Sequence, residues 1–142
     1  MTVATLVPER ARASGRRGPA VRFEHVTKAF GANRVLDDVS LEIPEGSGFV
    51  ILGRSGTGKS VALRHIIGLM RPDSGRVFVH NDEISSLYGE SLARVRRQIG
   101  FLFQSAALFD SISVGENVAF PMRRHTRISE REIRERVTAK LE

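Results

Sequence analysis

The sequence contains no cysteine and no long run of apolar residues. Because thiols are absent, disulfide bonds are excluded, and a zinc site would have to rely on histidine and carboxylate ligands. A helix needs roughly 20 predominantly apolar residues to span a bilayer, and no segment approaches that length. The N-terminus also lacks the apolar region of a secretory signal. We therefore expect any work at a membrane to depend on a partner.

Acidic residues are scarce relative to basic ones, and the 142-residue chain carries a formal net charge of +6. Half of this excess lies in residues 1–20, which are rich in Ala, Arg, Gly and Pro and show no periodicity. We predict that residues 1–20 form a disordered basic tail and that residues 21–142 belong to one domain. No aromatic residues are interleaved with these arginines, so we expect a solvated tail with no nucleic-acid partner.

Hydrophobic patterning predicts an α/β fold. Apolar and polar residues alternate at the start of Val21–Phe30, over residues 21–25, and over Val39–Ile43, which favours an N-terminal antiparallel β layer. Phe49–Leu52 and Ile99–Phe103 are instead unbroken apolar runs, typical of strands covered on both faces in a parallel sheet. A further short strand is expected at Arg76–His80.

Three helices are expected between and after these strands. Lys59–Met70 carries a broad apolar stripe, and Ser91–Gln98 is short and basic. Ser129 and Glu132 form a capping box, which predicts that a helix begins there. The four histidines fall in separate elements, so we expect packing or surface positions for them rather than a metal site.

The most specific motif is the segment GRSGTGKS, which matches the phosphate-loop pattern G-x-x-x-x-G-K-S/T in full. Its residues are Gly53, Arg54, Ser55, Gly56, Thr57, Gly58, Lys59 and Ser60. The glycines let backbone N–H groups converge on phosphate oxygens, and the following helix adds the positive end of its dipole. Lys59 is expected to bind the β- and γ-phosphates, and the Ser60 hydroxyl is expected to bind Mg²⁺. The motif therefore predicts a site for Mg-ATP.

The setting of the motif supports this interpretation, because it lies between an apolar strand and an amphipathic helix. The chain has only three lysines, against nineteen arginines, and one of them is Lys59. A lysine at the position where a compact charge is needed favours a functional role. The alternative, a glycine-rich turn with an incidental lysine, does not account for this setting.

With the loop in place, several other segments resemble the ATP-binding-cassette (ABC) transporter ATPases. Phe30 lies before Gly31 where that family has an aromatic that stacks on adenine; the alternative is a core aromatic at a strand end. Phe101–Gln104 resembles the family's Q-loop, which implies that Gln104 approaches Mg²⁺ and the attacking water. The alternative for Gln104 is a polar residue that merely ends a strand. Ser113–Val118 resembles the segment that commonly follows in this family.

A narrower resemblance, to the Mla/Mce-type lipid-transport ATPases, rests on Ile51–Leu63, Phe103–Phe109 and Asn117–Thr126. It implies that ATP hydrolysis, with catalytic roles for Lys59 and Gln104, energises lipid transport through a transmembrane permease. It also implies a second ATPase subunit in a homodimer and a Mce-type lipid-binding protein as a further partner. The implied location is cytoplasmic, on the inner face of the cell membrane.

The sequence lacks an LSGGQ-type signature, a Walker B strand ending in Asp and Glu, and a switch histidine. Ala106–Asp110 has the form of a Walker B motif, but it follows Phe103 too closely to form another parallel strand. We expect an incomplete P-loop NTPase core, the N-terminal part of an ABC ATPase truncated before these motifs, that alone does not turn ATP over. A nucleotide-binding module without turnover and a small P-loop kinase remain the alternatives, and the kinase lacks lid arginines and an acceptor site.

Overall fold

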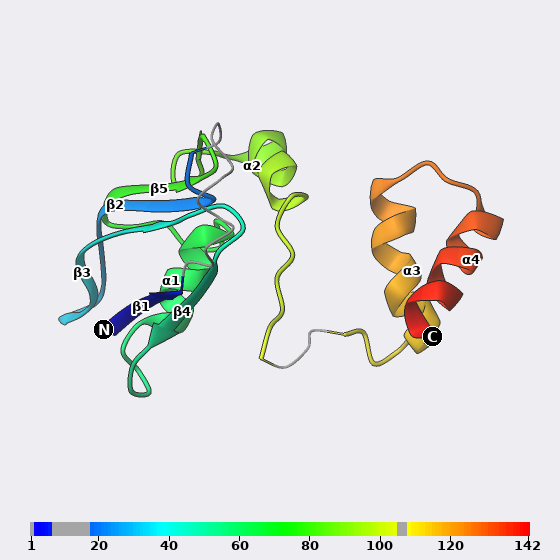
Figure 1. Ribbon diagram of the computed structural model, residues 1–142, viewed down its shortest axis with the longest axis horizontal. Coiled ribbons are helices and arrows are strands. Elements are labelled where there is room, and N and C mark those ends of the chain that lie inside the picture. The colour runs from blue at the N-terminus through cyan, green and yellow to red at the C-terminus, as the bar shows by residue number, and fades with distance from the viewer. Residues whose placement is uncertain (1, 7–17, 105–107) are drawn as a thin grey trace. The chain divides into compact units, whose positions relative to one another are not determined.

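The computed structural model describes residues 2–6, 18–104 and 108–142, and the chain divides into two compact units after Phe101 (Figure 1). The first unit contains β1 (Thr2–Leu6), β2 (Val21–Phe30), β3 (Asn33–Ile43), β4 (Gly48–Leu52), α1 (Lys59–Ile66), β5 (Ser74–Val79), β6 (Asp82–Glu83) and α2 (Gly89–Arg96). The second contains α3 (Val114–His125) and α4 (Glu130–Leu141). None of these helices has both the length and the apolar character needed to cross a membrane within the described ranges.

A four-stranded antiparallel sheet, in the order β3-β2-β5-β6, forms the larger β layer and confirms the predicted antiparallel layer. Its central strand β2 pairs with β3 on one side and with β5 on the other, so that Val21 lies opposite both Ile43 and Val79. β3 begins at Asn33, well before the predicted start at Val39, because a tight turn after Phe30 returns the chain directly into pairing.

The core of the first unit forms where this sheet meets α1 and α2. α1 contacts β3 and β5, and its buried residues are Ala62 and His65. Fully or nearly fully buried apolar side chains from the strands and helices complete the core: Phe23, Val26, Leu36, Ala62, Val77, Val79, Ile84 and Val95. Burying such side chains is worth about 1.5–3 kcal/mol each relative to leaving them exposed, so this cluster is what fixes the position of α1 against the sheet.

The prediction that β4 is covered on both faces is wrong for the part of the chain that the structure describes. β4 alternates between exposed and half-buried residues, with Val50 43% and Leu52 52% exposed. It pairs antiparallel with β1, so that Thr2 lies opposite Leu52 and Leu6 lies opposite Gly48. An apolar run is buried on both faces only where a further layer covers it, and that layer is not encoded in the run itself.

β1 also lies inside the segment predicted to be a disordered tail. The residues Thr2–Leu6 are uncharged and include β-branched side chains, and the edge of β4 supplies them with backbone hydrogen-bond partners. The arginines that suggested disorder come later, and residues 7–17 of the predicted tail lie outside the described residues.

One predicted strand and the end of one predicted helix also differ from the sequence predictions. Ile99–Phe103 is not a strand: it pairs with no described strand, and Leu102 is 84% exposed. α1 ends at Ile66 rather than at Met70, because the carbonyl of Arg64 accepts from the backbone N–H groups of Leu69 (2.9 Å) and Met70 (3.2 Å) and closes the helix early. α2 covers Gly89–Arg96, close to the predicted helix.

In the second unit, α3 and α4 pack against each other. The predicted helix start is confirmed, because the Ser129 hydroxyl accepts from the backbone N–H of Glu132 at 3.3 Å, which is one half of the predicted capping box. The Glu132 carboxylate accepts from Arg136 at 2.7 Å. Arg123 on α3 donates through Nε to Glu130 on α4 at 2.9 Å and joins the two helices. Asp110 lies in a turn, as predicted. Residues 105–107, which belong to the segment Phe103–Phe109 that resembles the lipid-transport ATPases, lie outside the described residues.

Candidate functional site

The phosphate-loop motif connects the end of β4 to the start of α1, as the sequence predicts. Two of its glycines adopt positive φ angles, 80° at Gly56 and 91° at Gly58, which only glycine adopts at no steric cost. The Thr57 hydroxyl and, more weakly, its backbone N–H donate to the Arg54 carbonyl at 2.8 Å and 3.4 Å, which closes the loop on itself. The motif therefore folds into a tight turn that leads directly into α1.

Gly58 holds this turn directly against β3. It is buried, and a Cβ placed on it would lie 2.8 Å from Val35 Cγ1 and 2.9 Å from the Val35 carbonyl oxygen. Its own carbonyl accepts the first helical hydrogen bond, from Ala62 N–H at 2.8 Å. Val35 was not among the predicted site residues, because nothing in the local sequence indicates which strand lies against the loop.

Lys59 points back into the loop that precedes it. Its ammonium group donates to the carbonyl oxygens of Gly53 at 2.8 Å and Arg54 at 2.7 Å. These two bonds place a positive charge at the mouth of the loop, where the motif needs one. Because the side chain is already ordered, little rotamer entropy has to be lost when an anion binds.

The N-terminus of α1 differs from those of the other described helices. α1 has no acidic residue in its first turn and no side-chain cap. By contrast, α2, α3 and α4 each carry a glutamate there, and Ser113 and Ser129 cap α3 and α4. The first backbone N–H groups of a helix lack intrahelical partners and carry its positive dipole end. At α1 these donors are left to an external anion, and no fixed negative charge competes for them.

Phe30 lies on the same hairpin that contacts the loop. It is the last residue of β2 and pairs with Asn33, two positions before the Val35 that packs on Gly58. Its side chain is 48% exposed, with the Lys28 ammonium 5.8 Å from the ring centroid. The alternative of a buried core aromatic is therefore wrong, and the ring is available to a ligand.

The two residues predicted to bind Mg²⁺ have different settings. Ser60 is the second residue of α1 and is exposed. Gln104 is exposed in a turn of the second unit, and its role remains a prediction. Within the described ranges, no group of three or more His, Asp or Glu side chains could hold a metal ion. A magnesium ion here would need oxygen ligands from the nucleotide, as is usual for this ion.

His65 is a buried titratable residue in the helix that carries the loop. It is 1% exposed, and its Nδ1 lies 2.7 Å from the Val61 carbonyl oxygen. Burial lowers the pKa of His65 below its ordinary value of 6.5, against the raising effect of the hydrogen bond to Val61. As predicted, this histidine has a packing position.

We expect the free energy of unfolding to fall as the pH drops below 6.5. Between the lowered folded pKa of His65 and 6.5, the unfolded chain binds a proton that the folded chain does not, so acidification favours unfolding. Urea unfolding at pH 7.5 and at pH 5.5 measures the difference. His65→Leu should reduce it and the exposed His125→Ala should not; equal pH dependence in all three chains would contradict this role for His65.

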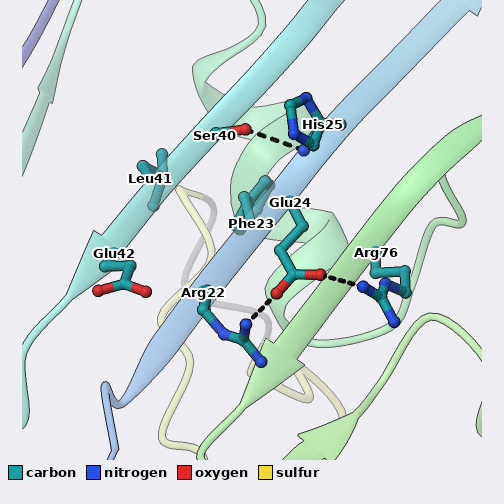
Figure 2. Close-up of a pocket in the computed structure, with 8 residues that line it drawn as sticks. All are labelled: Arg22, Phe23, Glu24, His25, Ser40, Leu41, Glu42 and Arg76. Atoms are coloured by element: carbon teal, nitrogen blue, oxygen red, sulfur yellow. Dashed lines mark hydrogen bonds and ion pairs between the residues drawn. The ribbon is translucent and has the colours of Figure 1, made fainter.

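A hollow of about 620 Å³ lies on the sheet, between residues of β2, β3 and β5 (Figure 2). It is lined by Arg22, Phe23, Glu24, His25, Ser40, Leu41, Glu42 and Arg76. Figure 2 shows the Glu24 carboxylate between two arginines, bonded to Arg22 and to Arg76 at 2.7 Å. Because its carboxylates balance its guanidinium groups, this hollow lacks the positive excess that a phosphate site requires.

Comparisons with known proteins point to one family. The family model described as ABC transporter matches residues 36–142. The "Probable ribonucleotide transport ATP-binding protein mkl" of Mycobacterium leprae is 44% identical over 125 residues, covering 88% of this chain and 36% of that protein. The chloroplastic protein TRIGALACTOSYLDIACYLGLYCEROL 3 of Arabidopsis thaliana is 43% identical over 122 residues, covering 85% and 35%. The chain thus spans about a third of the length of these relatives.

Solved structures show the same relationship. A dimeric ATP-binding cassette in a post-hydrolysis state, bound to ADP and Pi, matches with a TM-score of 0.76 and 34% identity, covering 84% of this chain and 54% of that one. The cbiO1 protein of Clostridium perfringens, part of the ABC transporter complex cbiONQ, matches with a TM-score of 0.70 and 30% identity, covering 87% and 49%. The likeness extends over most of this chain and about half of each neighbour.

Proposed function

This chain belongs to the ABC transporter family, and from that premise we propose that it binds the phosphates of Mg-ATP through Gly53–Ser60. The observation that carries the proposal is the start of α1. Backbone donors without a side-chain cap, an ordered lysine and the absence of a first-turn carboxylate all favour a polyanion at one point. A dianionic or more highly charged phosphate chain fits this set of groups better than a neutral ligand does.

We assign the loop residues the following roles. Gly53, Arg54, Ser55, Gly56, Thr57 and Gly58 surround the phosphates through their backbone, and Lys59 binds the β- and γ-phosphates. The Ser60 hydroxyl would bind Mg²⁺, and Gln104 would contact Mg²⁺ and the attacking water. Phe30 stacks on adenine.

The wider role we propose is that of an ATPase subunit in a transporter. The dimeric ATP-binding cassette bound to ADP and Pi supports pairing with a second ATPase subunit. The cbiO1 protein, part of a transporter complex, supports association with a membrane permease, which would place this chain at the cytoplasmic face of a membrane. Both partners belong to the proposal, because the chain spans only part of these proteins.

Lipid is the cargo we propose for the intact transporter, with a Mce-type lipid-binding protein as a further partner. The Arabidopsis relative is named after a galactosyl diacylglycerol, which is a lipid. Other relatives carry names for ribonucleotide, phosphonate and methionine transport. Purified transporter reconstituted into vesicles, with labelled phospholipid and labelled nucleotide offered in parallel, separates these cargoes.

A second function, nucleotide binding without turnover, is favoured by one feature of these 142 residues. They contain no LSGGQ-type signature and no Walker B strand ending in Asp and Glu, the groups that stabilise the transition state in this family. We propose that the chain on its own binds Mg-ATP and releases no phosphate above the uncatalysed rate. Phosphate release measured on the same samples as binding distinguishes this from an active ATPase.

We expect Phe30→Ala to weaken Mg-ATP about tenfold and to leave Mg-tripolyphosphate unchanged. Stacking of a base on an aromatic ring is worth about 1–3 kcal/mol, and tripolyphosphate has no base to lose. Isothermal titration calorimetry with both ligands measures the two affinities. Phe120 on α3, which is 48% exposed like Phe30, provides a matched control as Phe120→Ala. Equal weakening of both ligands by Phe30→Ala would contradict adenine stacking.

A further inference from the structure

We infer that Asp73 is a positioning residue for adenine recognition, fixing the end of β2 so that Phe30 is presented to the base. The inference rests on the proposed function, because it concerns the same nucleotide site. The sequence motifs described above do not include Asp73. The structure places its carboxylate against β2, the strand that ends in Phe30. The carboxylate contacts Ala29, which lies 44 residues earlier in the chain.

Asp73 continues the sheet where β5 stops. β2 and β5 pair as far as Thr27 and Ser74, and beyond that point the last three residues of β2 have no β5 partner. There, the Asp73 backbone N–H donates to the Thr27 carbonyl at 2.9 Å, and its Oδ2 accepts from the Ala29 N–H at 2.7 Å. A carboxylate thus replaces a strand neighbour and restrains the residue that precedes Phe30.

The other carboxylate oxygen holds Lys28. Asp73 Oδ1 accepts from Lys28 Nζ at 2.6 Å, and the Lys28 side chain is only 18% exposed. The same ammonium lies 5.8 Å from the centroid of the Phe30 ring, within the range of a cation–π contact. The hydrogen bonds from Lys28 and from Ala29 lower the pKa of Asp73, so the group stays ionised at neutral pH.

These contacts make one chain of restraint from Asp73 to the ring. One carboxylate fixes the backbone before Phe30 and also the cation that lies against its ring. Phe30 nevertheless stays 48% exposed, so the ring is held without being covered. An ordered, accessible aromatic loses little conformational entropy when a base stacks on it, whereas a free one must be ordered by the ligand.

The test compares a ligand with a base and a ligand without one. Calorimetry on the full chain gives the affinities of Asp73→Ala for Mg-ATP and Mg-tripolyphosphate. We expect about a fivefold loss for Mg-ATP and less than a twofold change for Mg-tripolyphosphate, since only the stacking contribution depends on Asp73. Lys28→Met, which keeps the backbone contact but removes the cation, should give a smaller loss of the same kind. The exposed Asp82→Ala on β6 is the matched control and should bind both ligands normally.

A double-mutant cycle separates positioning from general stability. In the background of Phe30→Ala, the loss caused by Asp73→Ala should disappear, because no ring remains to be positioned. If Asp73→Ala does not fold, Asp73→Asn, which retains an oxygen for the Ala29 N–H, is measured in the same way and should show a smaller loss for Mg-ATP alone.

Two results would overturn the inference and leave the proposed function standing. One is a double mutant whose affinity for Mg-ATP falls by the product of the two single losses. The other is an equal loss of affinity for Mg-ATP and Mg-tripolyphosphate in Asp73→Ala. A wild-type chain that binds neither ligand would overturn both.

Discussion

Replacing Lys59 by alanine lowers the affinity for Mg-ATP at least about a hundredfold, because charge-assisted hydrogen bonds to phosphate are worth about 1.5–3 kcal/mol each. The structure gives the reason for a loss this large. The ammonium is already bonded to the carbonyls of Gly53 and Arg54, so its charge sits at the loop before any ligand arrives. Calorimetric titration of Mg-ATP into the wild-type and Lys59→Ala chains measures the effect.

The matched control for this prediction is the lysine near the end of α4. Lys140→Ala removes the same charge from an exposed position in the second unit and should leave the affinity within twofold of the wild type, as expected for a solvated surface charge. Tripolyphosphate should follow ATP in both variants, since Lys59 contacts phosphate and not the base. If Lys59→Ala retained the wild-type affinity for Mg-ATP, the loop would not be part of the binding site.

Replacing Gly58 by alanine destabilises the first unit by about 3 kcal/mol, combining the cost of a positive φ with that of overpacking. Gly58 has φ 91°, and an added Cβ would approach the Val35 carbonyl oxygen to 2.9 Å. Since that neighbour is backbone, it cannot move aside by changing rotamer. The loop must then separate from β3, and Mg-ATP binding should be lost together with stability. Urea unfolding monitored by circular dichroism measures the change.

Gly56 offers the matched control within the same loop. It also has a positive φ, 80°, but an added Cβ there would meet nothing within 4 Å. Gly56→Ala should therefore lose only the conformational contribution, about 1 kcal/mol. If both alanine variants lose the same stability, the contact between Gly58 and Val35 carries no weight, and the loop is not anchored to β3 as described.

The features that could be predicted from the sequence are those set by neighbouring residues. The helix cap at Ser129 depends on a few consecutive positions, and the structure reproduces it. The alternation at residues 21–25 follows from one face of a strand packing on a core, and the antiparallel layer confirms the strand. The phosphate loop likewise lies between a strand and a helix because its residue types demand that geometry.

What could not be predicted depends on partners far away in the chain. Phe49–Leu52 and Ile99–Phe103 have the same apolar character, yet only β4 forms a strand, because β1 supplies its hydrogen-bond partners. The residues Thr2–Leu6 could not be assigned to a strand until β4 was known to offer an edge. Val35 on β3 lies against Gly58, and Asp73, just before β5, accepts from the Ala29 N–H. No local sequence pattern indicates such contacts.

The most direct test of the account is amide-resolved NMR of the full chain during titration with Mg-ATP. The account predicts that the largest shift changes fall on the backbone amides of Gly53–Ser60, with further changes around Phe30, because these groups meet the phosphates and the base. Amides of α4 that face solvent should stay unchanged. Saturation of ATP binding with the Gly53–Ser60 amides unshifted, or no binding at millimolar Mg-ATP, would contradict the central claim.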